Sequence, residues 1–227
     1  FQDFKPLLGF WKSTFVGLKQ FHYIFTMPSF RQAFVNTIII AFFKITLSIF
    51  VPLVLSLMLN EVTKSWFKRS VQTIVFIPYF FSWAILAGMV LEIFAYDGVI
   101  NNVLESLFGM EPIAFLVSNK YFRTIVIGSD VWKGMGYNTV LLLAAITNVD
   151  PTLHEAAQVD GAGRWKQMLH VTLPGIMPMV AVLTVLGLGG ILNAGFEQIL
   201  IMYNPTVEKS VDILDTLVYR LGMVSHQ

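Results

Sequence analysis

Four long apolar stretches that carry almost no charge dominate the sequence. They run from about residue 33 to 60, 70 to 96, 121 to 147 and 171 to 203. A helix needs about 20 mainly apolar residues to cross the hydrocarbon core of a bilayer, and each stretch reaches that length. We therefore predict an all-α integral membrane protein in which these four stretches are membrane-spanning helices.

The composition agrees with a lipid environment. Hydrophobic residues make up 56% of the 227 residues and charged residues only 13%, whereas soluble domains average about 25% charged residues. Many of the 20 Phe, 7 Tyr and 5 Trp lie near the ends of the apolar stretches, where aromatic rings favour the membrane interface. A net charge of +1 without a basic stripe argues against a nucleic-acid partner.

The sequence offers neither a metal site nor a nucleotide site. It has no cysteine, and its four histidines are spread out without the spacing of metal ligands: His22, His154, His170 and His226. The phosphate-binding pattern G-x-x-x-x-G-K-[S/T] is also missing. We therefore expect no cofactor in this chain, and any ATP hydrolysis must take place on a partner.

Basic residues give a partial indication of orientation. Three of them fall in the short loop at residues 61–69, and two more fall in the polar stretch at residues 148–170. Because positive charge marks cytoplasmic loops, we predict that both loops are cytoplasmic. Nothing repeats at a fixed period, so we treat the chain as one helical membrane domain.

The polar stretch predicts a helix, a sharp turn and a second helix. Asp150 is a suitable N-cap and Pro151 a suitable first helical residue, which predicts a helix from Pro151 to about Asp160. Gly161 and Gly163 can adopt the positive φ that ends one helix and redirects the chain. The small Ala156 and Ala157 would let a partner approach this helix closely.

Here the sequence resembles the coupling loop of ABC importer permeases, the EAA loop, at residues 148–174. The matching residues are Glu155, Ala156, Ala157, Asp160, Gly161, Ala162, Leu173 and Pro174. In that family the loop docks into a cleft of the ATPase subunit. Further stretches are similar to the polysaccharide-type branch of the sugar importers: FQDFKP, SLMLNEV, IPYFFSW, DVWK and GGILNAGFEQILIMYNP.

The resemblance implies a fold, partners and a location. It implies the helical bundle of a type I importer permease (MetI-like), with six spans of which one would precede Phe1 and one would follow Gln227. It implies a heterodimer with a second homologous permease, two ATPase subunits that bind ATP and Mg, and an extracytoplasmic solute-binding protein. This non-enzymatic subunit would form half of the path for an oligosaccharide or polysaccharide-derived sugar across the bacterial cytoplasmic (inner) membrane, as a multi-pass protein.

Charged and polar residues inside the apolar stretches are candidates for the substrate path, because such groups avoid lipid. The charged ones are Lys44, Glu92, Asp130, Lys133 and Glu197. Shared helical faces and aromatic rings suited to sugars extend the predicted path to Tyr79, Trp83, Trp132, Gly134, Tyr137, Asn138, Asn193, Phe196 and Glu197. The alternative is that Asp130 pairs with Lys133 and that Trp132 and Phe196 only pack.

Two other function classes remain open to a membrane protein of this kind. A secondary transporter or channel that does not use ATP would have no need of a loop that docks an ATPase. An intramembrane enzyme would need a nucleophile with a base, or a metal cluster, and the sequence has no HExxH, no GxSxG and no cysteine. A Glu-Ala-Ala triplet alone is also common in ordinary helical hairpins, so the whole spaced pattern carries the prediction.

Overall fold

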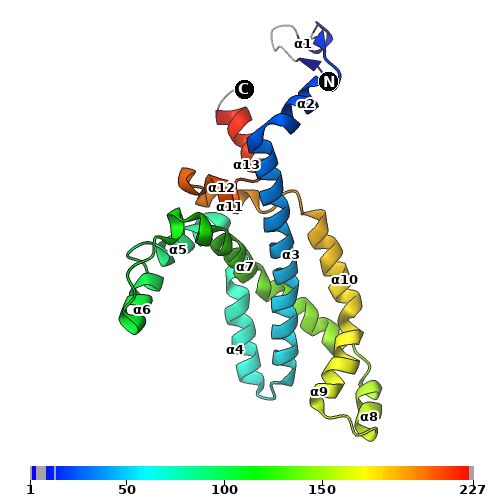
Figure 1. Ribbon diagram of the computed structural model, residues 1–227. Helices are drawn as coiled ribbons and strands as arrows, with labels where there is room; N and C mark the ends of the chain where they lie inside the picture. The colour runs from blue at the N-terminus through cyan, green and yellow to red at the C-terminus, as the bar shows by residue number, and fades with distance from the viewer. Residues whose placement is uncertain (1, 4–8, 13, 225–227) are drawn as a thin grey trace.

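The structure is a computed structural model that describes residues 2–3, 9–12 and 14–224, most of them helical (Figure 1). Two short strands pair antiparallel near the N-terminus, β1 (Gln2–Asp3) and β2 (Thr14–Phe15). The helical elements are α1 (Gly9–Lys12), α2 (Lys19–Thr26), α3 (Pro28–Glu61), α4 (Ser65–Phe76), η1 (Ile77–Phe80), α5 (Trp83–Ile93), α6 (Val99–Phe108), η2 (Phe115–Val117), α7 (Asn119–Thr147), α8 (Pro151–Val159), α9 (Arg164–Gln167), η3 (Met168–Thr172), α10 (Leu173–Gly189), α11 (Phe196–Met202), η4 (Pro205–Val207), α12 (Glu208–Val211), α13 (Leu214–Tyr219) and η5 (Arg220–Val224).

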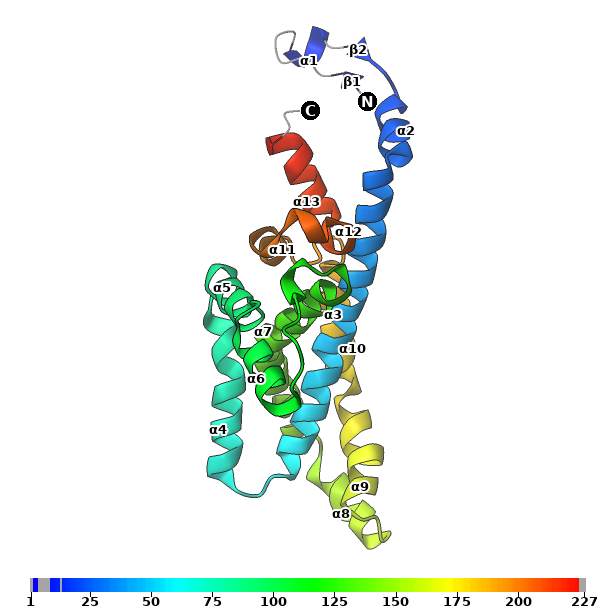
Figure 2. The same ribbon diagram turned by 60° about the vertical axis from the view of Figure 1, so that its left-hand side comes forward.

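The helices α3 and α7 form the centre of the bundle. Along α3 the buried residues lie at helical spacing on one face, and many are small or polar: Ala33, Thr37, Ala41, Lys44, Pro52 and Ser56. Small side chains let two helices approach closely in a membrane bundle, and α7 crosses this face of α3 obliquely (Figures 1 and 2). The apolar core accordingly lies between α3, α7 and the segment from residue 194 to 213.

Two helical stretches of the described chain are long and apolar enough to cross a membrane, Pro28–Glu61 and Arg164–Gly189. A third span results if Ser65–Phe80 and Trp83–Ile93 are counted together. The 29 residues of α7 exceed the length that a span needs, but the helix carries four charged residues. The predicted stretches 33–60 and 121–147 fall within α3 and α7, and their crossing of the membrane stays a prediction.

The other two predicted stretches are not single straight helices. The stretch 70–96 bends by 109° between η1 and α5, at the point where Pro78 removes a backbone donor. The stretch 171–203 breaks at residues 190–195, where the glycine-rich sequence leaves the helix and Ala194 and Gly195 adopt positive φ angles of 46° and 89°. Proline alone does not break these helices, because α3 continues through Pro52.

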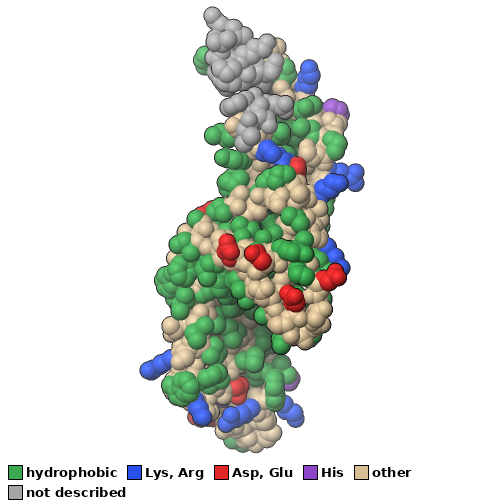
Figure 3. Space-filling model, turned by 90° about the vertical axis from the view of Figure 1, so that its left-hand side faces the viewer, with side chains coloured by type: hydrophobic (Ala, Val, Ile, Leu, Met, Phe, Trp, Pro, Cys, Tyr) green, Lys and Arg blue, Asp and Glu red, His purple; other side chains and the backbone are tan. Residues whose placement is uncertain are grey.

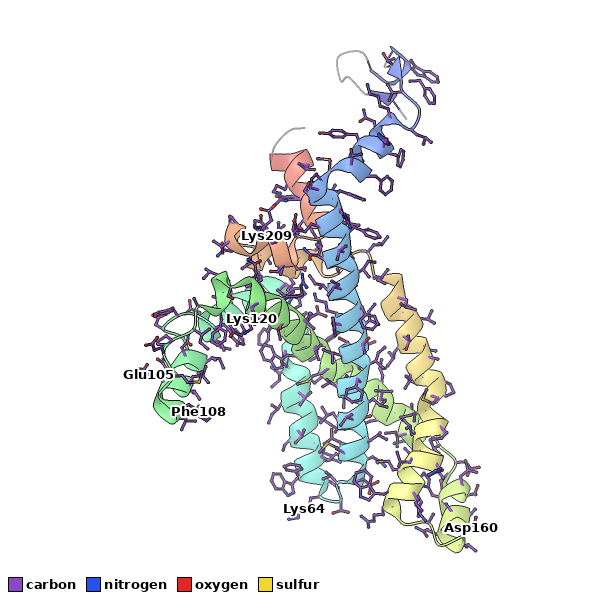
Figure 4. All side chains as sticks on the ribbon, in the orientation of Figure 1. Lys64, Glu105, Phe108, Lys120, Asp160 and Lys209 are labelled. Carbon is purple, nitrogen blue, oxygen red and sulfur yellow. The ribbon has the colours of Figure 1, made fainter. Side chains whose placement is uncertain are left out.

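The cytoplasmic loops that the sequence predicts lie together in space. The connection from α3 to α4 and the helices α8 and α9 occupy one end of the molecule, and both described chain ends lie towards the other (Figures 1 and 2). Figure 4 labels Lys64 and Asp160 at the first end. The shared end agrees with the predicted topology, while its sidedness stays a prediction.

The segment from α5 to η2 forms a lobe beside the bundle. Its acidic residues Glu92, Asp97, Glu105 and Glu111 are exposed, and the sequence has no Lys or Arg between Arg69 and Lys120. Acidic side chains gather at mid-height on the face in Figure 3, and basic ones lie towards both of its ends. The buried Asn101 holds the lobe together by donating to the carbonyls of Ala95, Tyr96 and Ile113.

Candidate coupling loop and transmembrane cavity

The helix α8 begins as the sequence predicts. The Asp150 carboxylate accepts a hydrogen bond from the Thr152 backbone N–H at 2.9 Å, which lowers the pKa of that carboxyl. Pro151 follows as the first helical residue, and the helix ends at Val159, one residue before the predicted end. The capping bond fixes the direction in which α8 leaves the end of α7.

A tight turn after α8 reverses the chain. Gly161 has a φ of +74°, and the Ala162 N–H donates to the Ala157 carbonyl at 2.8 Å. The Gln167 side chain then donates to the Ala162 carbonyl at 2.8 Å, which ties the turn to α9. The predicted helix, turn and helix are therefore confirmed, but the positive φ predicted for Gly163 is wrong: its φ is −68°, and Gly161 alone makes the turn.

The loop exposes apolar side chains at the tip of the molecule. Val159 is 88% exposed and Trp165 75% exposed, although the sequence places both among charged and polar neighbours. Glu155, Ala156 and Asp160 are also exposed, and Ala157 and Ala162 are half-buried. An exposed apolar patch with a polar rim is typical of a protein interaction site.

The end of the loop is anchored in the bundle. Leu173 packs against the cluster formed by Leu59, Leu143, Ile146, Val149 and Ile176. Pro174 follows it in the first turn of α10, directly after the π-helical turn η3. A Cβ on Gly175 would lie 2.8 Å from the Val149 side chain, so the two ends of the loop pack closely.

A cavity of about 350 Å³ lies between α3, α7 and α10. Its polar lining includes Lys44, Asp130, Tyr137 and Asn138, and the turn at Gly190, Ala194 and Gly195 closes one side. The Asn138 side chain donates to the Ser48 carbonyl at 2.8 Å, which joins α7 to α3 at the cavity wall. Aromatic, amide and carboxylate groups therefore meet at one open space within the bundle.

A buried polar network supports this cavity. Lys44 donates to Asp130 at 3.2 Å, to the Ala194 carbonyl at 3.0 Å and to the Gln198 amide oxygen. Gln198 in turn donates to the Val126 carbonyl at 2.7 Å and to the Ser129 hydroxyl at 2.8 Å. The ionic partner of Asp130 is therefore Lys44, and the alternative pairing of Asp130 with Lys133 is wrong.

Lys133 lies at a different place, against the bend between η1 and α5. Its ammonium donates to the carbonyls of Tyr79 and Phe81 and lies 5.6 Å from the centre of the Trp83 ring. Tyr79 stacks on Tyr137 with ring centres 4.8 Å apart and planes at 8°. The lysine thus supplies donors to carbonyls that the bend leaves without helical partners.

The residues predicted for the substrate path are divided between several places. Tyr137 and Asn138 line the cavity, whereas Tyr79 stacks on Tyr137 and is not part of the lining. Trp132 lines a separate apolar pocket of about 410 Å³ on another face of α7. Their roles in transport stay predictions.

The predicted residues near α11 make local contacts. The Asn193 side chain accepts from the N–H groups of Gly195 at 3.3 Å and Phe196 at 3.1 Å. Phe196 packs edge-on against Tyr219 at 5.9 Å, and Glu197 is exposed. Gly134, on α7, has open space where a Cβ would lie.

Three residues of this site escaped the sequence reasoning. Gln198 is fully buried, and the only signal for it is an amide inside the apolar stretch FEQILIM. Ala194 adopts the left-handed conformation that only its neighbour Gly195 suggests. Gly136 meets the backbone of α4 so closely that a Cβ would lie 2.5 Å from the Phe76 Cα, and no local pattern indicates such a partner.

The family model described as "binding-protein-dependent transport system inner membrane component" matches residues 44–213. The permease protein YteP of Bacillus subtilis (strain 168), of a polygalacturonan/rhamnogalacturonan transport system, is 43% identical over 229 residues, which cover 100% of this chain and 71% of the relative. Protein LplB of the same organism is 42% identical, over 98% of this chain and 70% of its own length.

Solved structures agree with the sequence relatives. A crystal structure of a bacterial ABC transporter involved in the import of the acidic polysaccharide alginate matches with a TM-score of 0.89 and 39% identity, over 94% of this chain and 74% of that one. An amino acid ABC transporter shares the fold alone, with a TM-score of 0.54 and 16% identity, over 94% of this chain and 86% of that one. The chain belongs to the family of binding-protein-dependent transport system inner membrane components, the permeases of ABC importers.

Proposed function

We propose that this permease forms half of the translocation path for an oligosaccharide derived from an acidic polysaccharide. It would pair with a second, homologous permease as a heterodimer in the bacterial cytoplasmic membrane. An extracytoplasmic binding protein would deliver the cargo, and two ATPase subunits would bind ATP and Mg and hydrolyse the ATP. This chain would itself catalyse no reaction.

The observation that carries the proposal is the exposed loop around α8. It presents Val159 and Trp165 to solvent, and its base is anchored by Leu173 in an apolar cluster. A force applied to α8 would therefore pass to α10, which lines the cavity. This arrangement supports a role of residues 148–174 in coupling to an ATPase.

The relatives and the cavity support the saccharide. The relatives named above serve polygalacturonan/rhamnogalacturonan and alginate import. In the cavity, the Tyr137 ring can stack on a pyranose face and the Asn138 and Asp130 side chains can bond to hydroxyl groups. The partner permease and the binding protein would supply the remaining specificity.

The test is uptake by the complete complex in proteoliposomes. Oligogalacturonides and oligoalginates should stimulate ATP hydrolysis and accumulate, whereas maltooligosaccharides should do neither. Ala157→Trp on α8 should abolish uptake and weaken binding of the ATPase, while Ala114→Trp on the exposed lobe of the bundle should retain both. Failure of every saccharide, or normal coupling in Ala157→Trp, would overturn the proposal.

A further inference from the structure

Lys44 is the point at which three separate elements meet beside the cavity. The residue is only 6% exposed. Its ammonium donates to the Ala194 carbonyl in the turn after α10, to Asp130 on α7 and to Gln198 on α11. An ammonium has three donors, so each of them is used on a different element.

The turn is shaped to receive this ammonium. Ala194 has a φ of 46° and Gly195 a φ of 89°, a combination that directs the Ala194 carbonyl at Lys44 instead of into a helix. A Cβ on Gly195 would collide with Lys44 Nζ, so glycine makes the approach possible. In an apolar interior a carbonyl without a partner is costly, and Lys44 supplies the partner.

The orientation of Gln198 confirms that a cation belongs here. Its amide nitrogen is committed to the Val126 carbonyl and the Ser129 hydroxyl, so its oxygen must face Lys44. The Asp130 carboxylate neutralises the positive charge of Lys44, and its own side chain is 27% exposed, towards the cavity. Carbonyl, amide and carboxylate oxygens thus surround the ammonium, and carbonyls of unwound backbone likewise coordinate cations in transporters with broken helices.

We propose that Lys44 is a positioning residue of the translocation path, a tethered cation that holds the turn between α10 and α11 and the Asp130 carboxylate as one wall of the cavity. It acts through Asp130, Ala194 and Gly195, which line the cavity together with Tyr137 and Asn138. The inference rests on the proposed saccharide transport and deepens it. Loss of the Lys44 charge should allow the turn and the Asp130 carboxylate to move, and this should weaken productive binding of the saccharide.

The chain has no cysteine, so a single cysteine introduced in place of Lys44 can be alkylated selectively. The choice of reagent then decides whether the positive charge is restored. In Lys44→Cys, alkylation with bromoethylamine rebuilds an ammonium at the length of lysine, and alkylation with propyl bromide gives a neutral side chain of the same length. The partner subunits would be cysteine-free, and the unsubstituted complex would receive the same reagents. Uptake of oligogalacturonide and its half-saturating concentration would be measured in proteoliposomes.

Lys44→Cys should take up substrate about tenfold more slowly at low concentration, the factor expected for the loss of charge-assisted hydrogen bonds. Bromoethylamine should restore uptake and lower the half-saturating concentration, and propyl bromide should not. Equal rescue by both reagents would mean that Lys44 only fills space. Equal rescue, no rescue, or no initial loss would each overturn the inference.

If Lys44→Cys fails to assemble into the complex, a second variant tests the inference. Lys44→Arg keeps a cation of similar length and leaves Asp130 in place, so it should assemble and take up substrate faster than Lys44→Met, which has a neutral side chain of similar length. If it does not, the inference fails. Absence of saccharide uptake by the unsubstituted complex would instead contradict the proposed function, so the two failures are distinguishable.

Discussion

Two helix breaks in this permease both leave backbone carbonyls without helical hydrogen-bond donors, and the two breaks lie in different surroundings. The first, between η1 and α5, bends the chain by 109°, and Lys133 of α7 donates to the carbonyls of Tyr79 and Phe81. The second follows α10 at residues 190–195, and Lys44 of α3 donates to the Ala194 carbonyl. At both breaks, a lysine from another helix replaces the missing backbone donors.

The difference lies in burial and in the number of partners. Lys133 lies at a partly open site, with the Trp83 ring 5.6 Å away. Lys44 is buried and joins α3 to α7, α11 and the turn. Water can replace some of the hydrogen bonds that Lys133 donates, but it can replace few of those that the buried Lys44 donates. The second break therefore depends on one charge, whereas aromatic packing also stabilises the first.

The largest effect is expected from Gly195→Ala, which attacks the second break directly. The added Cβ would collide with Lys44 Nζ, and the residue has a φ of 89°. Strain and overpacking together should destabilise the complex by about 3 kcal/mol. Thermal unfolding of the detergent-purified complex would measure the loss.

Gly190→Ala, in the same turn, is the matched control. Gly190 has a φ of −96° and its nearest neighbour to an added Cβ is 3.7 Å away, so its midpoint should stay close to that of the unsubstituted complex. Equal losses in the two variants would show that the turn tolerates no side chain at all, and the specific fit to Lys44 would be wrong.

A smaller effect, about 2 kcal/mol, is expected from Gly136→Ala at the first break. An added Cβ would lie 2.5 Å from the Phe76 Cα and 2.7 Å from the Val75 carbonyl carbon, which would push α4 away from α7 and from Lys133. Gly128→Ala on the same helix has open space for a Cβ and should be neutral. Thermal unfolding of both variants would separate close packing from a loss of glycine flexibility, and equal midpoints would refute the close contact.

The smallest effect is expected from Asn193→Ala, which removes the side-chain acceptor for the Gly195 and Phe196 N–H groups. Loss of these side-chain hydrogen bonds costs about 1 kcal/mol. Asn193→Ser keeps a capping oxygen and should recover most of the stability and the uptake. If Asn193→Ser is as impaired in uptake as Asn193→Ala while its stability is normal, Asn193 contacts the cargo, as the sequence reasoning predicts.

The sequence predicts most of the fold and the helix, turn and helix at residues 150–167 because both depend on local patterns. Apolar stretches indicate α3 and α10, and Asp150, Pro151 and Gly161 indicate the limits of α8. The all-α importer permease fold is confirmed by the family model and the alginate importer structure. Each of these features can be predicted without knowing which helices contact one another.

The cavity could not be predicted in the same way, because its parts come from helices far apart in the chain. A lone lysine in an apolar stretch indicates a partner but does not say that Lys44 meets Asp130 and Ala194. Trp132 and Tyr137 share a helix, yet they line different spaces. Membership of one helix is therefore weaker evidence for a site than a motif whose parts are adjacent.

Disulfide formation in the double variant Ile45→Cys/Gly187→Cys tests most directly whether Lys44 holds the end of α10 against α3. A Cβ at Gly187 would lie 3.8 Å from the Ile45 Cβ, a separation typical of disulfides, and the natural chain has no competing thiol. If Lys44 holds the end of α10 against α3, the pair should crosslink readily in the unsubstituted background and in Lys133→Met, but several-fold more slowly in Lys44→Met, roughly as expected for the loss of charge-assisted hydrogen bonds. Equal crosslinking rates in all three backgrounds would contradict the account.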